Sequence, residues 1–223
     1  MNTRPDAADL PRMRIRNVRH VILDWSGTIS DDRLPVHASN QLMLAKRGLV
    51  PLGYREWLRM SNVSAHALLE SLGMTEDKHA VDAEYEATYR EVRARGTHPT
   101  MYPDARLLLE RVRSAGIATS VVSAHPTTHL LVEATEYGLV EFIDNWIGSV
   151  PDKTAAIAAE AVRSSRDHAI YVGDTVFDVR AARTAGVRAV AVSTGYHDHE
   201  RLRLEDPDHL VSSLAELADA LDL

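Results

Sequence analysis

The stretch that decides the fold is VRHVILDWSGT (18–28), in which an apolar run ends in polar residues. The segment RHVILDW (19–25) contains a short, β-branched apolar run, which is typical of a strand covered on both faces of a sheet. Asp24 follows at once, and Gly27 provides a turn. A strand that ends in a carboxylate can present a reactive group, although a lone aspartate here more often serves a turn.

From residue 98 onward, helical and strand patterns alternate along the chain. Strand patterns occur in IATSVVS (117–123), HAIYVGD (168–174) and VRAVAVST (187–194), and more weakly in FIDNWIGS (142–149). Helical patterns lie between them, several with a glycine just past their end. This βαβα order predicts an α/β fold, a Rossmann-like doubly wound parallel sheet with helices on both faces.

Between residues 35 and 97 the pattern is helical throughout. Apolar residues recur there at three- and four-residue spacing, and no segment has a convincing strand pattern. We therefore predict an all-helical insertion at 35–97 within an α/β core formed by 16–34 and 98–223. Residues 1–15 are expected to form a loose N-terminal tail.

The composition excludes several classes of protein. The 223 residues carry a formal net charge of -7 with acidic and basic residues interspersed, which gives no sign of a nucleic-acid or membrane surface. No apolar run approaches the ~18 residues needed to span a bilayer. The absence of cysteine removes disulfides and thiolate chemistry. We expect a cytoplasmic protein, a monomer or homodimer, whose partner is a small molecule rather than nucleic acid or membrane.

Polar side chains follow the predicted strands where those strands end. Asp24, Ser123 and Asp174 each come directly after a strand, Lys153 begins the helix before the strand that carries Asp174, and Asp178 follows one helical turn later. Ligands of parallel sheets bind at the carboxyl ends of the strands, so these groups are expected to converge. A carboxylate there can be a nucleophile or a Mg²⁺ ligand, and a lysine can neutralise a phosphoryl group.

Taken together, four short motifs carry a family resemblance. They are DWSGT (24–28), VVSAH (121–125), PDKTAAI (151–157) and GDTVFD (173–178). In order and position they resemble the four motifs of the haloacid dehalogenase-like hydrolase superfamily, in its phosphoglycolate phosphatase and phosphonoacetaldehyde hydrolase-like branch with a helical cap. The resemblance covers the chain from about Val18 onward and implies a Mg²⁺-dependent phosphatase that acts on a small phosphorylated metabolite.

The resemblance also implies the chemistry of the nucleophile and the metal. Asp24 would attack phosphorus and carry the aspartyl phosphate. Asp24, Asp174 and the main-chain carbonyl of Ser26 would bind Mg²⁺, and Asp178 would support the water shell of the metal.

The remaining motif residues would contact the substrate. Thr28 and Ser123 would position the phosphoryl group, and Lys153 would hold both the nucleophile and the phosphate. Gly27 and Ala124 would bring their backbone to the same group.

Ser26 departs from the pattern of the family. Most phosphatases of this superfamily have a second aspartate there, which protonates the leaving group and then activates water. A serine hydroxyl cannot act as a carboxylic acid near neutral pH, and the loss of a positioned general acid-base costs ~10²–10⁴-fold in rate. Four residues could in principle reach this position and replace the missing aspartate: Asp31, Asp32, His37 and His125.

Two further functions compete with a phosphatase. Phosphonoacetaldehyde hydrolase has a similar tryptophan and small residue after its nucleophile, but it cleaves a carbon–phosphorus bond with a cap lysine, and only Lys46 and Lys78 lie in the predicted cap. A phosphate-binding or regulatory protein of low turnover would also fit the loss at Ser26. A metal-free dehalogenase, which usually has tyrosine at that position, and a receiver-type phosphoacceptor domain, which has no cap, fit less well.

The cap and the C-terminal region offer further candidates. Six residues in the predicted cap or just before it could give charge or stacking to a substrate: Arg33, Lys46, Arg55, Trp57, Arg59 and His66. The segment YHDHE (196–200) resembles a metal site in composition, but it follows the predicted last strand and is interpreted as a solvated loop.

Overall fold

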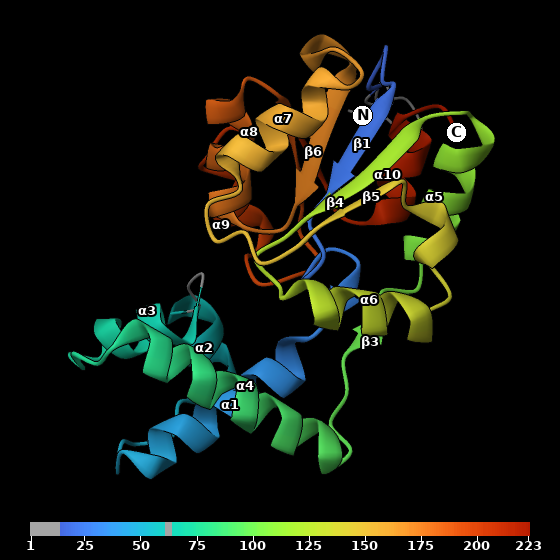
Figure 1. The fold of residues 1–223 in the computed structure, drawn as a ribbon. Coiled ribbons are helices and arrows are strands. Elements are labelled where there is room, and N and C mark those ends of the chain that lie inside the picture. The colour runs from blue at the N-terminus through green and yellow to red at the C-terminus, as the bar shows by residue number, and fades with distance from the viewer. Residues whose placement is uncertain (1–13, 61–63) are drawn as a thin grey trace, which may run out of the picture.

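A six-stranded parallel sheet forms the centre of the computed structural model, which describes residues 14–60 and 64–223 (Figure 1). Strand β1 lies inside it, between β4 and β6, with His20 beside Ala118 on one side and Ala169 on the other. In spatial order the strands are β5 (Asn145–Ile147), β4 (Ala118–Val122), β1 (His20–Leu23), β6 (Ala169–Gly173), β7 (Arg188–Val192) and β8 (His209–Val211). The predicted α/β class and doubly wound parallel sheet are confirmed.

Both faces of the sheet are buried, which explains why β1 lacks polar alternation. Val21 and Leu23 point into one apolar core, and Ile22 points into the other. On the first face lie α5 (Ala105–Ser114), α6 (Thr127–Glu136) and α10 (Leu214–Ala220). On the second face lie α7 (Thr154–Val162), α8 (Val176–Ala185) and α9 (His199–Arg203).

A helical insertion interrupts the chain between β1 and α5. Its elements are α1 (Arg33–Lys46), α2 (Tyr54–Met60), α3 (Ala65–Ser71) and α4 (Lys78–Ala94). The chain enters through β2 (Ser30–Asp31) and leaves through β3 (Thr100–Met101), and these two short strands pair antiparallel. In Figure 1 the insertion lies beyond the arrowheads of the central strands.

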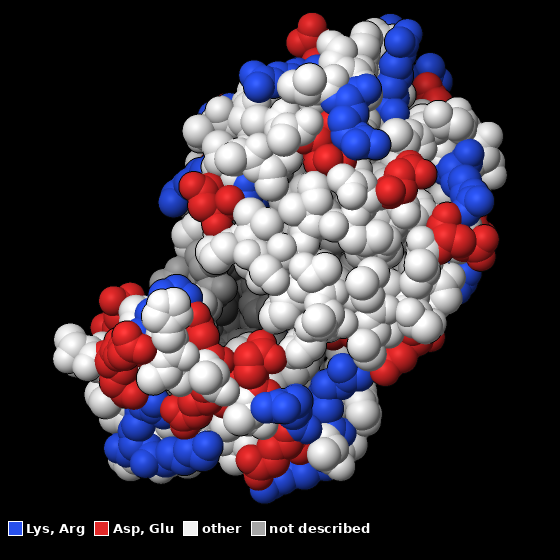
Figure 2. Space-filling view, in the orientation of Figure 1, with Lys and Arg blue, Asp and Glu red and all other residues white. Residues whose placement is uncertain are grey.

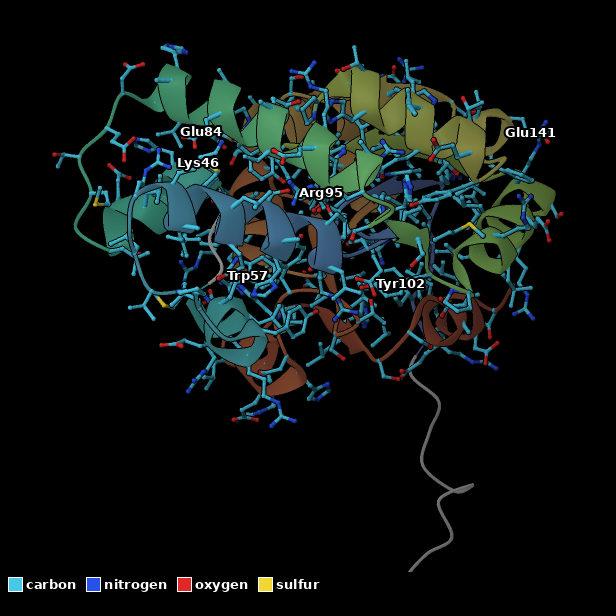
Figure 3. The ribbon with its side chains drawn as sticks, turned by 90° about the horizontal axis from the view of Figure 1, so that it is seen from below. Lys46, Trp57, Glu84, Arg95, Tyr102 and Glu141 are labelled. Carbon is cyan, nitrogen blue, oxygen red and sulfur yellow. The ribbon has the colours of Figure 1, made fainter. Side chains whose placement is uncertain are left out.

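The helical insertion has a small core of its own. Met43 and Leu44 of α1 pack with Leu69 of α3 and Val81 of α4, because their helical spacing places apolar side chains on the facing sides of these helices. Lys46 and Glu84 mark the contact of α1 with α4 in Figure 3, and their charged atoms lie 3.5 Å apart.

The C-terminal region differs from the sequence prediction. The strand at 187–194 is not the last one, since β8 follows it and pairs with β7 through Val190 and His209. β8 has only three residues, too few for a periodic pattern, and it forms because β7 offers a free edge. Two short one-turn helices, Val140–Phe142 and Arg166–His168, complete the described elements.

The surface agrees with the mixed charge of the sequence. On the face shown in Figure 2, basic and acidic side chains are interspersed and the surface is hollowed where the insertion meets the core. Within the described ranges, no helix combines the length and the apolar character that crossing a membrane requires.

Candidate active site

The three central strands bring the predicted residues to one edge of the sheet. Asp24, Ser123 and Asp174 follow β1, β4 and β6, which are neighbours in the sheet. All three side chains are buried. The main-chain N–H of Asp24 donates to the carbonyl of Val172 at 2.8 Å, which continues the pairing of β1 with β6 beyond the strand.

A tight turn presents the Asp24 side chain. The carbonyl of Trp25 accepts hydrogen bonds from the N–H groups of Ile29 (2.8 Å) and Ser30 (2.9 Å). Gly27 has a φ of +76°, and a Cβ there would lie 2.2 Å from the Asp174 carboxylate. Glycine is therefore required at this position by both the backbone conformation and the close approach of Asp174.

Lys153 connects two of the carboxylates. Its Nζ lies 2.6 Å from Oδ2 of Asp24 and 2.7 Å from Oδ1 of Asp178. The ammonium group is largely buried and occupies the position just before α7. Burial alone would lower the pKa of Lys153, but the charges of Asp178 and Asp24 outweigh it and raise that pKa, so the lysine is a fixed cation.

Asp24, Asp174 and Asp178 form a carboxylate cluster. One oxygen of each lies within 4.8 Å of the others, and all three groups are buried. Burial and the charges of Asp178 and Asp24 raise the pKa of Asp174 well above its ordinary value. Burial also raises the pKa of Asp24, against the opposing charge of Lys153. One ammonium does not balance three carboxylates, and oxygen ligands at this spacing suit a hard divalent cation.

Local helix structure fixes Asp178. Thr175 and Asp178 form a capping box at the start of α8, and the Tyr171 hydroxyl donates to Asp178 at 3.1 Å. Burial would raise the pKa of Asp178, but Lys153 and the hydrogen bonds of Thr175 outweigh it and lower that pKa. The carboxylate stays charged and oriented before any ligand arrives.

The other motif residues are placed at the same edge with different surroundings. The buried Thr28 hydroxyl donates to Oδ1 of Asp174 at 3.2 Å and is not among the residues that line the adjoining cavity. Ser123 and Ala124 do line it. The hydroxyl of Ser123 lies beside Asp24, and its hydrogen bond opposes the burial that raises the pKa of that carboxyl.

A cavity of about 870 Å³ extends from this cluster to the helical insertion. Its core side includes Asp24, Ser26, Asp32 and Lys153. Its insertion side includes Trp57, which Figure 3 shows on the insertion. A volume of this size between two parts of a fold is typical of a small-molecule site.

Comparison with known proteins agrees with the geometry. Residues 21–192 match the family described as haloacid dehalogenase-like hydrolase. The chain belongs to this family. The predicted superfamily and the prediction of a hydrolytic enzyme are thereby confirmed.

Similar proteins of the hydrolase family carry related names. The chain is 26% identical over 185 residues to a phosphoglycolate phosphatase of Rhodobacter capsulatus, across 79% of this chain and 84% of that protein. It is 26% identical over 225 residues to a phosphoglycolate phosphatase of Neisseria meningitidis, across 93% and 95%. A solved structure described as a predicted phosphatase from Clostridium acetobutylicum has a TM-score of 0.79 at 20% identity, across 92% of this chain and 99% of that one, which shows the shared fold.

Ser26 of this hydrolase is hydrogen-bonded to a buried carboxylate. Its hydroxyl donates to Asp32, and the Tyr196 hydroxyl donates to the other oxygen of Asp32 at 2.9 Å. Asp32 stands just before α1 but does not cap that helix, although aspartate is a preferred cap. Burial raises the pKa of Asp32 to about 6, against the opposing effects of His125 and Ser26.

The other candidates for proton transfer are engaged elsewhere. Asp31 forms an ion pair of 2.7 Å with Arg33 and does not line the cavity. The His37 ring shares a hydrogen bond of 3.0 Å with the Leu52 carbonyl inside the insertion. His125 lines the cavity, but its ring lies 3.3 Å from the buried Glu133, with which it pairs. Of these four residues, Asp32 is the one with a described hydrogen bond to Ser26.

Glu133 of α6 connects the first motif, at Trp25, with the second motif, at His125. Its Oε2 accepts from the Trp25 indole at 2.7 Å and from the Ser30 hydroxyl at 3.0 Å, while Oε1 faces His125. Trp25 also stacks on Tyr137 at 5.9 Å between ring centroids. Trp25 therefore has a structural role in holding the turn that presents Asp24, which sequence reasoning did not find.

Glu133→Gln is expected to lower the free energy of unfolding by roughly 3 kcal/mol, because it leaves the buried His125 without the carboxylate that pairs with it. Burial opposes both charges, but Glu133 raises the pKa of His125 and His125 lowers that of Glu133. The pair contributes fully between the unfolded values of 4.5 and 6.5. Its contribution falls as pH rises through the raised pKa of His125, or drops through the lowered pKa of Glu133.

Chemical denaturation of both proteins across this pH range measures the effect. The matched control is Glu136→Gln on the same helix, whose carboxylate is half-exposed and pairs with Arg93. An equal, pH-independent loss in the two variants would contradict a charge pair at Glu133.

The interpretation of YHDHE (196–200) as a solvated loop is wrong for its first residues. The N–H of Tyr196 donates to Oδ2 of Asp174 at 2.7 Å, and buried His197 accepts from the N–H of Val176 at 2.9 Å. A Cβ on Gly195 would lie 2.0 Å from Asp174. This loop follows β7, so its place at the carboxyl end of a parallel strand was the signal that could have located it.

Among the six predicted contact residues of the insertion, Trp57 lines the cavity. Arg33 is paired with Asp31, Lys46 with Glu84, and the His66 ring shares a hydrogen bond of 3.1 Å with the Glu76 carbonyl. The remaining two, Arg55 and Arg59, are exposed on α2 and do not line the cavity.

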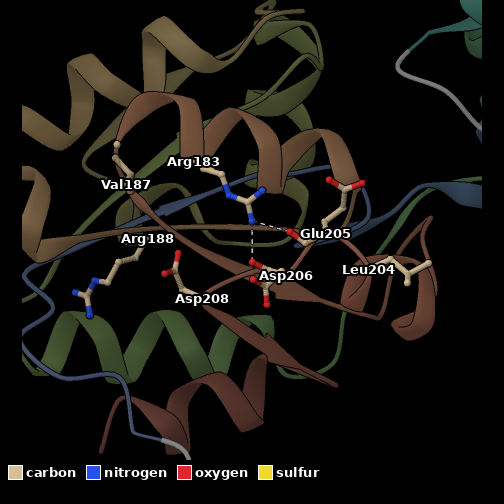
Figure 4. Close-up of a pocket in the computed structure, with 8 residues that line it drawn as sticks. Arg183, Val187, Arg188, Leu204, Glu205, Asp206 and Asp208 are labelled. Atoms are coloured by element: carbon tan, nitrogen blue, oxygen red, sulfur yellow. Dashed lines mark hydrogen bonds between the residues drawn. The ribbon is translucent and has the colours of Figure 1, made fainter.

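A second hollow lies at the opposite end of the sheet (Figure 4). It surrounds the start of β7 at Arg188, and Arg183 donates there to the main-chain carbonyls of Glu205 and Asp206. The amino end of a parallel strand is not where sheets of this kind bind ligands. Arg183 fastens the connection between α9 and β8.

Proposed function

We propose that this hydrolase is a Mg²⁺-dependent phosphatase that releases phosphate from a small phosphorylated metabolite through an aspartyl phosphate on Asp24. The observation that carries the proposal is the buried ammonium of Lys153 between Asp24 and Asp178, at one end of a cavity large enough for a small molecule. The names of the relatives in Rhodobacter capsulatus and Neisseria meningitidis support the same reaction class.

Formation of the phosphoenzyme uses Asp24, Lys153 and Ser123. A carboxylate oxygen of Asp24 attacks phosphorus, an oxygen–phosphorus bond to the leaving group breaks, and the turn around Gly27 holds the nucleophile in place. Lys153, already 2.6 Å from Asp24, neutralises charge on both reactants. The Ser123 hydroxyl is placed to donate to a phosphoryl oxygen.

Asp24 and Asp174 are the side chains that would hold Mg²⁺, together with the main-chain carbonyl of Ser26, and Asp178 would support the water shell of the ion. When bound, the ion would offset carboxylate and phosphate charge and orient the phosphoryl group. The raised pKa of Asp174 is consistent with a cluster that has excess negative charge.

We propose Asp32 as the group that replaces the aspartate missing at Ser26. The protonated Asp32 carboxyl gives its proton to the leaving oxygen as the oxygen–phosphorus bond breaks, which forms the alcohol and leaves the Asp32 carboxylate. That carboxylate then takes a proton from water as the water oxygen attacks phosphorus and the bond to Asp24 breaks, which regenerates both aspartates. Ser26 and Tyr196 orient Asp32 by donating to its two oxygens.

The helical insertion is proposed to act as a cap. Trp57 on α2 contacts Tyr196 of the core at 5.8 Å between ring centroids, and Tyr196 in turn binds Asp32. Closure at this contact would exclude water from the phosphoryl group and fix the proton donor together.

A phosphonoacetaldehyde hydrolase is not favoured. Schiff-base chemistry needs a lysine whose pKa is lowered by burial, but the side chains of Lys46 and Lys78 are about half exposed, at 53% and 52%. Each also pairs with an acid, Lys46 with Glu84 and Lys78 with Asp82. The tryptophan shared with that family has a structural explanation in its bond to Glu133.

Phosphate release tests the proposal. The purified protein is expected to release inorganic phosphate from part of a panel of phosphate monoesters in Mg²⁺. After removal of the metal with EDTA the rate should fall to background, because the carboxylate cluster then repels the phosphate, and added Mg²⁺ should restore it. Binding of phosphate analogues without any turnover across the panel would instead favour the phosphate-binding or regulatory protein.

A further inference from the structure

The helical insertion supplies a largely apolar side of the cavity. Its lining includes aromatic and aliphatic side chains from the insertion and one from α8 of the core: Val36, Trp57, Ala65, Leu68, Tyr85 and Phe177. Such a wall stabilises an organic group by removing apolar surface from water, and it gives no specific partner to a second anion.

The cations of the lining are already paired. Besides Lys153, the described lysine and arginine residues of the cavity are Lys78, which pairs with Asp82, and Arg180, whose Nε binds Glu205 at 2.9 Å. Asp82 itself lines the cavity, and so does Glu86. A substrate carboxylate on this side would therefore meet acidic groups without an unpaired cation among the described lining residues, and like charges in contact reduce affinity.

The size of the cavity gives the same indication. Its volume of about 870 Å³ is in the range that encloses molecules much larger than a two-carbon phosphorylated acid. Such an acid would leave the apolar wall without contact.

Resting on the proposed phosphatase function, we infer that the substrate is a phosphate monoester whose organic group is uncharged and largely apolar. A phosphorylated carboxylate of the phosphoglycolate type, which names the relatives above, does not suit this cavity. The phosphate lies at the carboxylate cluster and Lys153, and the apolar part lies against Trp57 and Leu68.

Four substrates with primary alcohol leaving groups test the inference in the Mg²⁺-loaded protein. They are benzyl phosphate, 4-(hydroxymethyl)benzyl phosphate, 4-carboxybenzyl phosphate and phosphoglycolate. We expect kcat/KM for benzyl phosphate to exceed that for 4-carboxybenzyl phosphate and for phosphoglycolate by roughly 100-fold. The hydroxymethyl compound, which is close in size to the 4-carboxybenzyl ester but uncharged, should stay within about 10-fold of benzyl phosphate.

A matched pair of variants checks the electrostatic cause. Ala65, the first residue of α3, lines the cavity and is only partly buried, so a longer side chain at this position can extend into the cavity. Ala65→Lys should raise the ratio of 4-carboxybenzyl to benzyl phosphate turnover by about 10-fold. Ala65→Gln, similar in size and uncharged, should not.

The outcomes separate this inference from the proposed function. Preferred turnover of phosphoglycolate or 4-carboxybenzyl phosphate would overturn the inference and leave the phosphatase in place. If no ester is hydrolysed, the phosphatase proposal fails, and calorimetric affinities for benzylphosphonate and phosphonoacetate decide the selectivity. Tighter binding of phosphonoacetate would then contradict the uncharged substrate class.

Discussion

Asp24→Asn is expected to lower phosphate release by about 10⁴-fold or more, in line with the loss of other catalytic nucleophiles. A carboxamide has nearly the same shape as the carboxylate but cannot form an acyl phosphate. Its oxygen can still accept the hydrogen bond of 2.7 Å from the Trp25 N–H. The change also removes one of three neighbouring buried carboxylates, so the fold should be retained.

The phosphoenzyme provides a direct measurement. Acid quenching of the wild-type protein during turnover should show one added phosphoryl group by mass spectrometry, located on the peptide that contains Asp24. Asp167→Asn is the control, because Asp167 is exposed just before the amino end of β6. Wild-type turnover by Asp24→Asn, or a phosphorylated wild type whose label lies elsewhere, would remove Asp24 from the role of nucleophile.

The sequence predicted those parts of the molecule that follow from local pattern and strand order. β1, β4, β6 and β7 are apolar runs long enough to recognise, and parallel order alone then places Asp24, Ser123 and Asp174 at one edge. Lys153 lies beside them because α7 begins there. Local pattern of this kind does not depend on knowing any tertiary contact.

The sequence could not predict contacts between separate motifs. The bond of Tyr196 to Asp32 joins positions 164 apart, and Glu133 is bonded to Trp25 across 108 positions. Nothing in the spacing of these residues indicates that they meet. The same limit applies to β8, whose three residues form a strand only because β7 has an unpaired edge.

Asp32 shows this limit most clearly. The sequence placed it beside Asp31 in a short connection, with equal reason to choose either. In the structure the two aspartates have different partners. Asp31 forms an ion pair with Arg33, whereas Asp32 is buried and accepts hydrogen bonds from Ser26 and Tyr196. The serine that interrupts the first motif is thereby accompanied by a carboxylate six positions later, in contact with the place where the aspartate is missing.

Variants of Asp32 and Ser26 give the sharpest test of the role of Asp32. Asp32→Asn is expected to lower kcat by ~10²–10⁴-fold on alkyl phosphates, whose leaving groups need a proton, because the amide cannot donate and then accept it. In single-turnover measurements of phosphoenzyme formation, the step that needs the acid, the loss should be much smaller on p-nitrophenyl phosphate, whose leaving group departs as an anion. Such a dependence on the leaving group distinguishes proton transfer from a structural defect, which would lower both rates alike.

The double variant Ser26→Asp/Asp32→Ser should then recover most of the activity on alkyl phosphates. It returns one carboxyl group to the same contact and keeps the number of buried charges unchanged. Ser26→Asp alone should give no gain, because it places two buried carboxylates against each other. Asp31→Asn is the control and should hydrolyse alkyl phosphates close to the wild-type rate, since Asp31 does not line the cavity. If Asp32→Asn is as active as Asp31→Asn on alkyl phosphates, the proton must come from another group, and the contact between Ser26 and Asp32 serves only the fold.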